Sequence, residues 1–189
     1  MRRDTARIFD EYLAASARAG DRASFGRLAA RWQPKLIGHA FRLMGDADQA
    51  RDVVQDAWAD IARGLARLDD AAAFPAWAYR IVSNKAADAI RSAQRGRKLN
   101  ASFAAQPAPA NRAVEQMETG ADKTPLAQAL GALPPDQRAV VALFYREDFS
   151  VAEVAAALNV PAGTVKTRLM HARRKLRAAL EGGKSDDGH

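Results

Sequence analysis

A run of basic residues near the C-terminal end of the 189-residue chain has a composition that suits phosphate binding. Six lysines and arginines, and no acidic residue, lie between Val160 and Leu180. Surface helices normally interleave acids with bases, because like charges repel unless a polyanion neutralises them. The plain alternative is a solvated basic face on a structural helix. The absence of acids favours contact with nucleic-acid phosphates.

The basic run belongs to a predicted helix-turn-helix from Ser150 to Leu180. Ser150 and Glu153 have the spacing of a capping box, and Asn159-Val160-Pro161 ends the first helix. A second helix begins at Gly163-Thr164. Its expected inward stripe consists of Val165, Leu169, Ala172 and Leu176. This motif predicts binding to double-stranded DNA.

The helix-turn-helix geometry divides the labour among the side chains of the second helix. Its N-terminal residues meet base edges, and flanking basic residues meet phosphates. The candidates for reading bases are Thr164, Lys166, Thr167, Met170 and His171. The candidates for clamping the backbone, or for reading further bases, are Arg168, Arg173 and Arg174.

Four aspartates recur at every fourth position of another predicted helix: Asp48, Asp52, Asp56 and Asp60. The helix dipole favours the first of them, but Asp56 lies too far from the helix start for that effect. Such like-charged neighbours each cost about 0.2–0.5 kcal/mol. One explanation is solvent exposure with Arg51 and Arg63 nearby. The other is an acidic face, with Gln55 beside it, that docks on a basic protein.

A second basic helix follows Phe74 and Trp77. It presents polar residues at a spacing of three to four: Arg80, Asn84, Asp88, Arg91 and Arg95, with Lys85, Arg97 and Lys98 adjoining. Aromatic residues beside a basic helix suit unstacked bases of a single strand. Trp77 also fits the apolar stripe of this helix, so it is expected in the core, and an exposed polar residue is the plain explanation of Asn84.

The elements that position these residues are all predicted to be helices, because alanine, leucine and arginine dominate long periodic segments with little glycine or proline. Expected helices cover about 5–19, 21–33, 35–44, 47–65, 75–94, 126–130, 136–146, 151–158 and 164–180. Asp21 and Asp46 are the expected N-caps, and Pro34 is expected to separate the second helix from the third. The core is expected to contain Trp32, Phe41, Val54, Trp58, Ile61 and Leu65.

The fold class is therefore all-α, with two small helical domains at 1–98 and 124–181. Residues 99–123 lose the helical periodicity and contain Pro107, Pro109 and Gly120, which predicts a flexible linker. About 25 residues reach at most ~85 Å and average ~28 Å as a coil. Residues 182–189 are expected to form a disordered tail.

The amino-acid composition limits the kinds of site and partner that the chain can have. The chain has 29 Lys and Arg against 22 Asp and Glu, a formal net charge of +7, which favours a polyanionic partner. It has no cysteine, so thiolate metal sites, disulfides and a cysteine nucleophile are excluded. Its histidines are too scattered to predict a metal site, and no cofactor is expected. No signal peptide or spanning segment is recognised, so a cytoplasmic location without membrane insertion is expected.

Taken together, the motifs resemble the extracytoplasmic-function (ECF) type of bacterial RNA polymerase sigma factor, in the sigma-70 family. In the first half the resemblance lies in Gly20-Asp21 with Phe25, in the run Asp52 to Trp58, and in the run Trp77 to Asn84 with Asp88 and Arg91. In the second half it lies in Leu133-Pro134, Gln137-Arg138, the run Gly163 to Arg168, and Ala172-Arg173. The order and spacing together are specific, and the two halves correspond to regions 2 and 4.

The resemblance implies a promoter-specificity subunit rather than an enzyme. Asp52, Gln55 and Asp56 match the surface that grips the clamp helices of the polymerase β′ subunit, and the β flap is a second implied contact. The minus 10 element is implied to meet the Asp69 to Phe74 connection and Asn84, with Arg80, Lys85, Asp88 and Arg91. The second helix of the helix-turn-helix is implied to read the minus 35 element. An anti-sigma factor and a stress or signal response are also implied.

Two departures and two rival functions accompany this interpretation. His171 stands where arginine is common, and Ala78 replaces a frequent leucine. One rival is an ordinary transcriptional regulator with a ligand-binding or dimer-forming N-terminal domain, which has no need of the acidic and basic helices. The other is a nucleic-acid enzyme that uses Asp52 and Asp56 as metal ligands, although the sequence shows no convergent partners for them.

Overall fold

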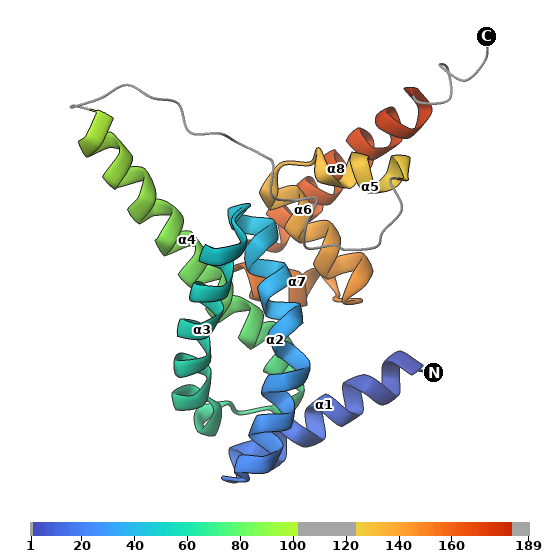
Figure 1. Ribbon diagram of the computed structural model, residues 1–189. Helices are drawn as coiled ribbons and strands as arrows, with labels where there is room; N and C mark the ends of the chain where they lie inside the picture. Colours follow the sequence, from blue (N-terminus) through green and yellow to red (C-terminus); the bar gives the residue numbers. More distant parts are fainter. Residues whose placement is uncertain (1, 102–123, 183–189) are drawn as a thin grey trace.

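The computed structural model describes residues 2–101 and 124–182 of the chain, with side chains placed from 5 to 96 and from 124 to 181. Helices α1 (Arg2–Arg18), α2 (Arg22–Met44), α3 (Ala47–Gly64) and α4 (Phe74–Ala101) form the N-terminal half (Figure 1). Short helical turns η1 (Leu65–Arg67) and η2 (Ala71–Ala73) join α3 to α4. Over these residues the predicted all-helical class is confirmed.

The C-terminal half consists of five helical elements. They are α5 (Pro125–Gly131), α6 (Pro135–Val141), η3 (Ala142–Arg146), α7 (Val151–Leu158) and α8 (Ala162–Gly182). The turn η3 is wider than an α-helix, since the Glu147 N–H donates to the Ala142 carbonyl five residues before it, at 3.2 Å. Most of the predicted linker and the predicted tail lie outside the described residues, and α4 extends into the start of the linker.

Helix α2 passes through Pro34 without interruption, so the predicted break there was wrong. Proline removes one backbone hydrogen bond, to the carbonyl of Ala30. Both Pro34 and Ala30 are exposed, so water can reach that carbonyl. Burial of Trp32 and Leu36 on the opposite side of the helix holds the two segments in one line.

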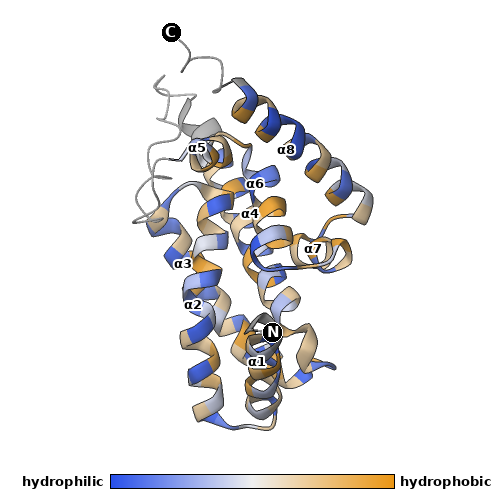
Figure 2. Ribbon diagram, turned by 90° about the vertical axis from the view of Figure 1, so that its right-hand side faces the viewer, coloured by the Kyte–Doolittle hydropathy of each residue, from blue (hydrophilic) through white to orange (hydrophobic). Residues whose placement is uncertain are grey.

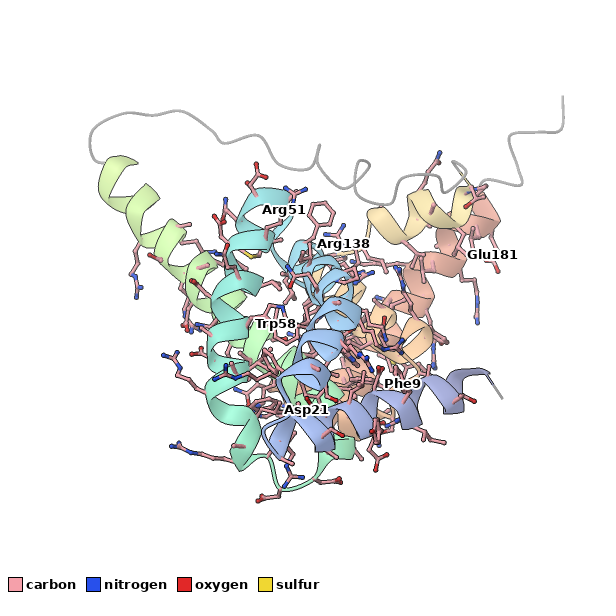
Figure 3. The ribbon with its side chains drawn as sticks, turned by 60° about the horizontal axis from the view of Figure 1, so that its bottom comes forward. Phe9, Asp21, Arg51, Trp58, Arg138 and Glu181 are labelled. Atoms are coloured by element: carbon pink, nitrogen blue, oxygen red, sulfur yellow. The ribbon has the colours of Figure 1, made fainter. Side chains whose placement is uncertain are left out.

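The core of the N-terminal half lies between α2, α3 and α4. Trp32 is buried edge-to-face against Phe74 and Tyr79, at ring distances of 5.4 and 5.6 Å. Trp58 lies between α2 and α3 (Figure 3), edge-on to Phe25 at 5.9 Å, and its indole N–H donates to Gln33. Trp58 is partly buried, and the other predicted core residues are buried: Phe41, Val54, Ile61 and Leu65.

The predicted helix caps are present. Asp21 accepts from the Ala23 N–H at 2.9 Å, and the Ser24 hydroxyl, with that N–H, lowers the pKa of the Asp21 carboxyl. Asp46 accepts from the Asp48 and Gln49 N–H groups. Helix α2 ends at Gly45 with a φ of 74°, a left-handed conformation that glycine adopts without strain.

One glycine is required by packing rather than by its backbone angle. A Cβ atom on Gly64 would lie 2.8 Å from Cζ2 of Trp77, closer than two carbons can approach. The missing side chain lets the Trp77 ring cover the end of α3, where it is partly buried against the core. This agrees with the prediction that Trp77 is a packing residue.

The two halves pack against each other, with α7 against α4 and α6 against α2 (Figures 1 and 2). Phe149 is buried edge-on to Tyr79 at 5.6 Å. Arg138 donates to the Arg42 carbonyl at 3.3 Å, at the junction of the halves (Figure 3). Among the described residues no helix is both long and apolar enough to cross a lipid bilayer.

Candidate nucleic-acid interface

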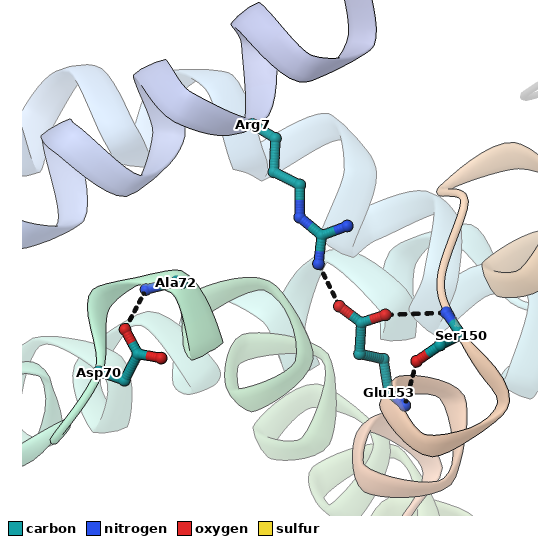
Figure 4. Close-up of polar contacts among 5 residues, drawn as sticks. All are labelled: Arg7, Asp70, Ala72, Ser150 and Glu153. Atoms are coloured by element: carbon teal, nitrogen blue, oxygen red, sulfur yellow. Dashed lines mark hydrogen bonds and ion pairs between the residues drawn. The ribbon is translucent and has the colours of Figure 1, made fainter.

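The predicted helix-turn-helix forms from α7, a tight turn and α8. The Ser150 hydroxyl accepts from the Glu153 N–H at 3.2 Å, and Glu153 accepts from the Ser150 N–H at 2.8 Å, which completes the predicted capping box (Figure 4). Burial would raise the pKa of Glu153, but these hydrogen bonds and Arg7 lower it. Asn159 ends α7 in the left-handed conformation, with a φ of 54°.

Helix α8 separates an apolar stripe from a basic face. Val165, Leu169 and Ala172 are buried against the other helices of this half, and Leu176 is half-buried. The opposite side is hydrophilic (Figure 2). It also has a hollow that is open to solvent. The hollow is lined by Lys166, Met170, Arg173, Arg174 and Arg177. Of the predicted minus 35 residues, Lys166, Thr167, Met170, Arg173 and Arg174 are exposed, and Thr164, Arg168 and His171 are half-buried.

The two arginines at the flanks of α8 have different partners. Arg168 pairs with Asp136 of α6, at 3.1 Å between Nε and Oδ2. Arg173 donates from Nε to the hydroxyl of Tyr145 in η3, at 2.8 Å. The charge of Arg168 is therefore neutralised by a carboxylate. The charge of Arg173 is not neutralised, because its partner is a neutral hydroxyl.

The four aspartates of α3 differ in their partners: the negative charge is neutralised at the two ends of the row and not in its middle. Asp48 pairs with Arg51 at 2.6 Å. Asp60 pairs with Arg63 and, at 2.7 Å, with Lys85 of α4, and these hydrogen bonds lower its pKa. Asp52 and Asp56 are exposed, as is Gln55 between them, and neither carboxylate has an ion pair within the described residues.

Nothing in the described part of the chain turns this pair into a metal site, because no group of three or more histidine or acidic side chains converges there. Two carboxylates on one exposed helix face offer a cation few ligands. What the arrangement does provide is concentrated negative charge with freely accessible oxygens. Such a surface is complementary to lysines and arginines of another protein.

The polar residues of α4 lie along one exposed side of the helix. Arg80 and Asn84 are exposed, and their side chains make no hydrogen bond or ion pair with the described residues. Asp88 and Arg91, one turn further on, form an ion pair with each other. Lys85 is half-buried and is held by Asp60, so its ammonium joins α4 to α3.

Phe74 needs a correction as a candidate DNA contact. Its side chain is completely buried, edge-on to Trp32 and tilted against Trp77. The ring therefore has no surface to offer a base in this conformation, and it anchors the first turn of α4. Just before it, Asp70 caps η2 by accepting from the Ala72 N–H at 2.9 Å (Figure 4), and both residues are exposed.

A buried cluster of neutral groups between α2 and α4 adjoins the contact between the halves, because its Tyr79 ring packs on Phe149. His39 donates or accepts through Nε2 with Ser83 Oγ at 2.8 Å and packs 4.9 Å from the Tyr79 ring. Burial, together with the charge of Arg42, lowers the pKa of His39 to about 3. Burial and the nearby carboxylate of Glu147 raise the pKa of Tyr79 above its usual range.

Ion pairs also join the N-terminal half to the C-terminal half. Lys35 of α2 lies 3.4 Å from Glu147, and its ammonium also lies 4.5 Å from the Trp32 ring. Arg7 of α1 pairs with Glu153 of α7 (Figure 4), so the capping box of the helix-turn-helix is also a contact with the N-terminal half.

Sequence patterns did not identify several of the contacts that shape the charged faces. Asp136 and Tyr145 sit 32 and 28 residues from the arginines they hold, and Lys85 sits 25 residues from Asp60. No periodic pattern connects such pairs.

Comparison with known proteins identifies both halves. The family described as sigma-70 region 2 matches residues 28–96, and the family described as sigma-70, region 4 matches residues 123–176. The two matches correspond to the N-terminal core with α3 and α4 and to the half that contains the helix-turn-helix.

Relatives with the same organisation match most of the chain. The ECF RNA polymerase sigma factor SigM of Mycobacterium tuberculosis is 33% identical over 178 residues, covering 90% of this chain and 84% of that protein. SigL of the same organism is 34% identical over 147 residues, 77% of this chain and 82% of that protein. The RNA polymerase sigma-H factor of Pseudomonas aeruginosa is 28% identical over 183 residues, 91% and 94% of the two chains.

Solved structures agree. The sigma factor RpoE from Bartonella quintana, in complex with the anti-sigma factor NepR, superposes with a TM-score of 0.65 at 25% identity, covering 83% of this chain and 96% of that one. CnrH, in complex with the cytosolic domain of CnrY, superposes with a TM-score of 0.59 at 28% identity, covering 92% and 98%. The predicted family is confirmed: the chain belongs to the sigma-70 family, as an ECF-type sigma factor with regions 2 and 4, and not to a family of enzymes.

Proposed function

We propose that this chain binds core RNA polymerase through the N-terminal half and reads a two-part promoter with both halves, without covalent chemistry. One observation carries the proposal: each half presents a helix face with charge that the chain leaves uncompensated. Asp52 and Asp56 on α3 have no ion pair with any residue that the structure describes, and the basic face of α8 contains no acid. Opposite charges on separate halves suit two different partners, one basic and one polyanionic.

The acidic pair is the proposed contact with the polymerase. Asp52, Gln55 and Asp56 share one exposed side of α3, and their neighbours along the helix are already paired. The clamp helices of the β′ subunit are the expected basic partner, and the β flap is the expected partner of region 4. Electrostatic complementarity of this kind sets the register and speeds association.

The exposed side of α4 is the proposed contact with the minus 10 element. Arg80 and Asn84 are free to meet a displaced strand, and Arg91 and Asp88 extend the same side toward the helix end. Asn84 can hydrogen-bond the edge of an unstacked base, while the arginines meet phosphates. Lys85 supports α4 through Asp60 and contributes charge beside this surface.

The N-terminal turns of α8 are the proposed reader of the minus 35 element. Lys166, Thr167 and Met170 are exposed on the basic face, and His171 and Thr164 flank them. A lysine can donate to guanine acceptors in the major groove, and a methionine can contact a thymine methyl group. Arg174 lies beside them, with one Nη 3.4 Å from Nδ1 of His171.

Promoter binding requires the two halves to separate. Two DNA elements about two helical turns apart lie ~70 Å from each other, whereas α7 packs directly on α4 here. Breaking this contact exposes Phe149 and Tyr79 and releases the ion pair of Lys35 with Glu147. We propose that core polymerase holds the halves apart, with residues 99–123 as the tether.

An anti-sigma partner is part of the same proposal. One of the two solved relatives named above was determined in complex with an anti-sigma factor, and the other in complex with the cytosolic domain of CnrY. A partner that stabilises the packed halves would prevent the separation, and activity in the cytoplasm would follow its release in a stress or signal response. Co-purification of the chain from its own cells would identify this partner.

Run-off transcription tests the function directly. Purified chain, core polymerase and a fragment library of genomic DNA are combined, and co-migration of the chain with core is measured on a sizing column. The expected result is a stable complex and new transcripts from a subset of fragments. If the chain neither co-migrates with core nor stimulates any fragment, it is not an initiation factor. Binding to DNA without core would instead favour the regulator.

A further inference from the structure

We propose that Tyr145 is a phosphate-binding residue, and that it forms with Arg173 a two-residue clamp for one phosphate of duplex DNA at the edge of the minus 35 element. The inference rests on the proposed function and extends it to a residue outside the helix-turn-helix. Tyr145 belongs to η3, the wide helical turn that precedes α7, and its side chain is 50% exposed.

The geometry of the pair fixes the arginine in place. Nε of Arg173 donates to Oη of Tyr145 at 2.8 Å. The guanidinium carbon also lies 5.7 Å from the Tyr145 ring and 5.9 Å from the ring of Phe144, which is edge-on to Tyr145. A long side chain with two aromatic contacts and a hydrogen bond has few alternative rotamers. Less conformational entropy is therefore lost when it binds a ligand.

The same geometry leaves the donors that an anion needs. Arg173 uses only Nε, so both Nη groups stay available, and the described residues give it no carboxylate partner. Tyr145 accepts from Arg173, so its own O–H remains a donor, and no acceptor for it is found among those residues. Guanidinium and phenol donors side by side match the neighbouring oxygens of a phosphate.

Comparison with Arg168 shows that this arrangement is specific to one flank of α8. Arg168 is held by the carboxylate of Asp136, which cancels its charge. Arg173 is held by a neutral hydroxyl, so it is oriented and remains fully cationic. The hollow lined by Arg173, Lys166 and Met170 places it beside the proposed base-reading residues. Phosphates border the groove that such residues enter.

The test uses the full chain as holoenzyme with core polymerase and a promoter fragment isolated by its transcription with the wild-type protein. Equilibrium affinity is measured over a series of KCl concentrations, on this fragment and on one with a scrambled minus 35 element. The variants are Tyr145→Phe, Arg173→Gln and their combination. Tyr12→Phe is the matched control, because it removes an equally accessible hydroxyl from α1, far from the helix-turn-helix in sequence.

Tyr145→Phe keeps the ring and removes the hydroxyl. We expect about a tenfold loss of affinity, the effect of one hydrogen bond to a charged group, by the same factor on both fragments. Arg173→Gln should reduce the slope of log K against log[salt] by about 0.9. The combined variant should lose less than the product of the two losses, and Tyr12→Phe should bind as the wild type.

Other results overturn the clamp. Unchanged affinity of Tyr145→Phe would exclude a contact, and a loss confined to the intact minus 35 element would indicate base reading. A loss accompanied by a lower unfolding temperature would indicate a structural role, and a loss of core affinity alone would indicate a protein partner. If the wild-type chain binds neither core nor promoter, the proposed function itself fails. The measurement on the wild-type chain shows this before any variant is examined.

Discussion

The acidic face of α3 and the basic face of α8 are both rows of like charge on a helix, yet the charged side chains that have partners differ between them. On α3 the outer aspartates are neutralised, and the central pair, Asp52 and Asp56, has no ion pair within residues 5–96 and 124–181. On α8 the central cations are exposed and the flanking arginines are held by other helices. Uncompensated charge concentrates at the middle of each face.

The two arrangements of charge favour different kinds of partner. A small exposed acidic pair suits a protein surface, where a few desolvated charges determine affinity. A wide basic face with oriented edges suits duplex DNA, where many phosphates contribute and the edges set the register. The two faces therefore predict different responses to substitution and to salt.

Reversing the charge of Asp56 should have the largest effect. Asp56→Arg places a cation against a basic partner, which costs several kcal/mol, so the affinity for core polymerase should fall about 100-fold or more. Asp48→Asn is the control, because Asp48 already pairs with Arg51. Sedimentation or sizing with core polymerase measures the affinity. Equal core binding by Asp56→Arg and the wild type would mean that the acidic face is merely solvated.

Removing one base-reading candidate from α8 should have a smaller and more selective effect. Lys166→Ala should cost about 1–3 kcal/mol on the preferred minus 35 element and relax the preference there. The holoenzyme affinity is compared between the preferred element and single-base changes. A uniform loss on every sequence, with a smaller salt slope, would reassign Lys166 as a phosphate contact.

Much of the fold could be predicted because its signals are local. Asp21, Asp46 and Ser150 act on N–H groups two or three residues away, so the caps can be recognised in the sequence. The helix-turn-helix and the stripe from Val165 to Ala172 follow from periodicity over a few turns. The two charged faces could be recognised for the same reason.

The remaining features depend on contacts between distant segments. Proline statistics predicted a break at Pro34, but burial on the other side of α2 outweighs one lost hydrogen bond. Phe74 is an aromatic residue beside a basic helix, which suits base stacking. Only its packing against Trp32 shows that it belongs to the core. The partners of Arg168 and Arg173 lie in α6 and η3. Helix α7 packs on α4, although the two helices are far apart in the sequence.

The buried cluster of His39, Ser83 and Tyr79 contrasts with both faces, because its groups are neutral, and acid should destabilise it. An unfolded chain takes up a proton at His39 near pH 6.5, whereas the folded chain does so only near pH 3. Stability should therefore fall as pH drops through this window, by about 1–2 kcal/mol between pH 6.5 and 5. Urea unfolding at each pH measures it.

A substituted residue separates this effect from other titrations. His39→Gln should flatten the pH dependence over that window, whatever its cost in absolute stability. His171→Gln, the same change at a half-buried position on α8, is the control. An equally steep fall in His39→Gln would assign the pH dependence to carboxylates rather than to the contact between Tyr79 and His39.

The smallest expected effect concerns the flank of α8 opposite Tyr145. If Arg168 leaves Asp136 to contact a phosphate, breaking that ion pair opposes DNA binding by about 0.2–1 kcal/mol. Asp136→Asn should then tighten promoter binding by at most about fivefold and steepen the salt dependence. Unchanged affinity and slope would instead make Arg168 a brace between α6 and α8. In that case the clamp would lie on one side of α8 alone, and Arg168→Gln should lower the unfolding temperature without changing the salt slope.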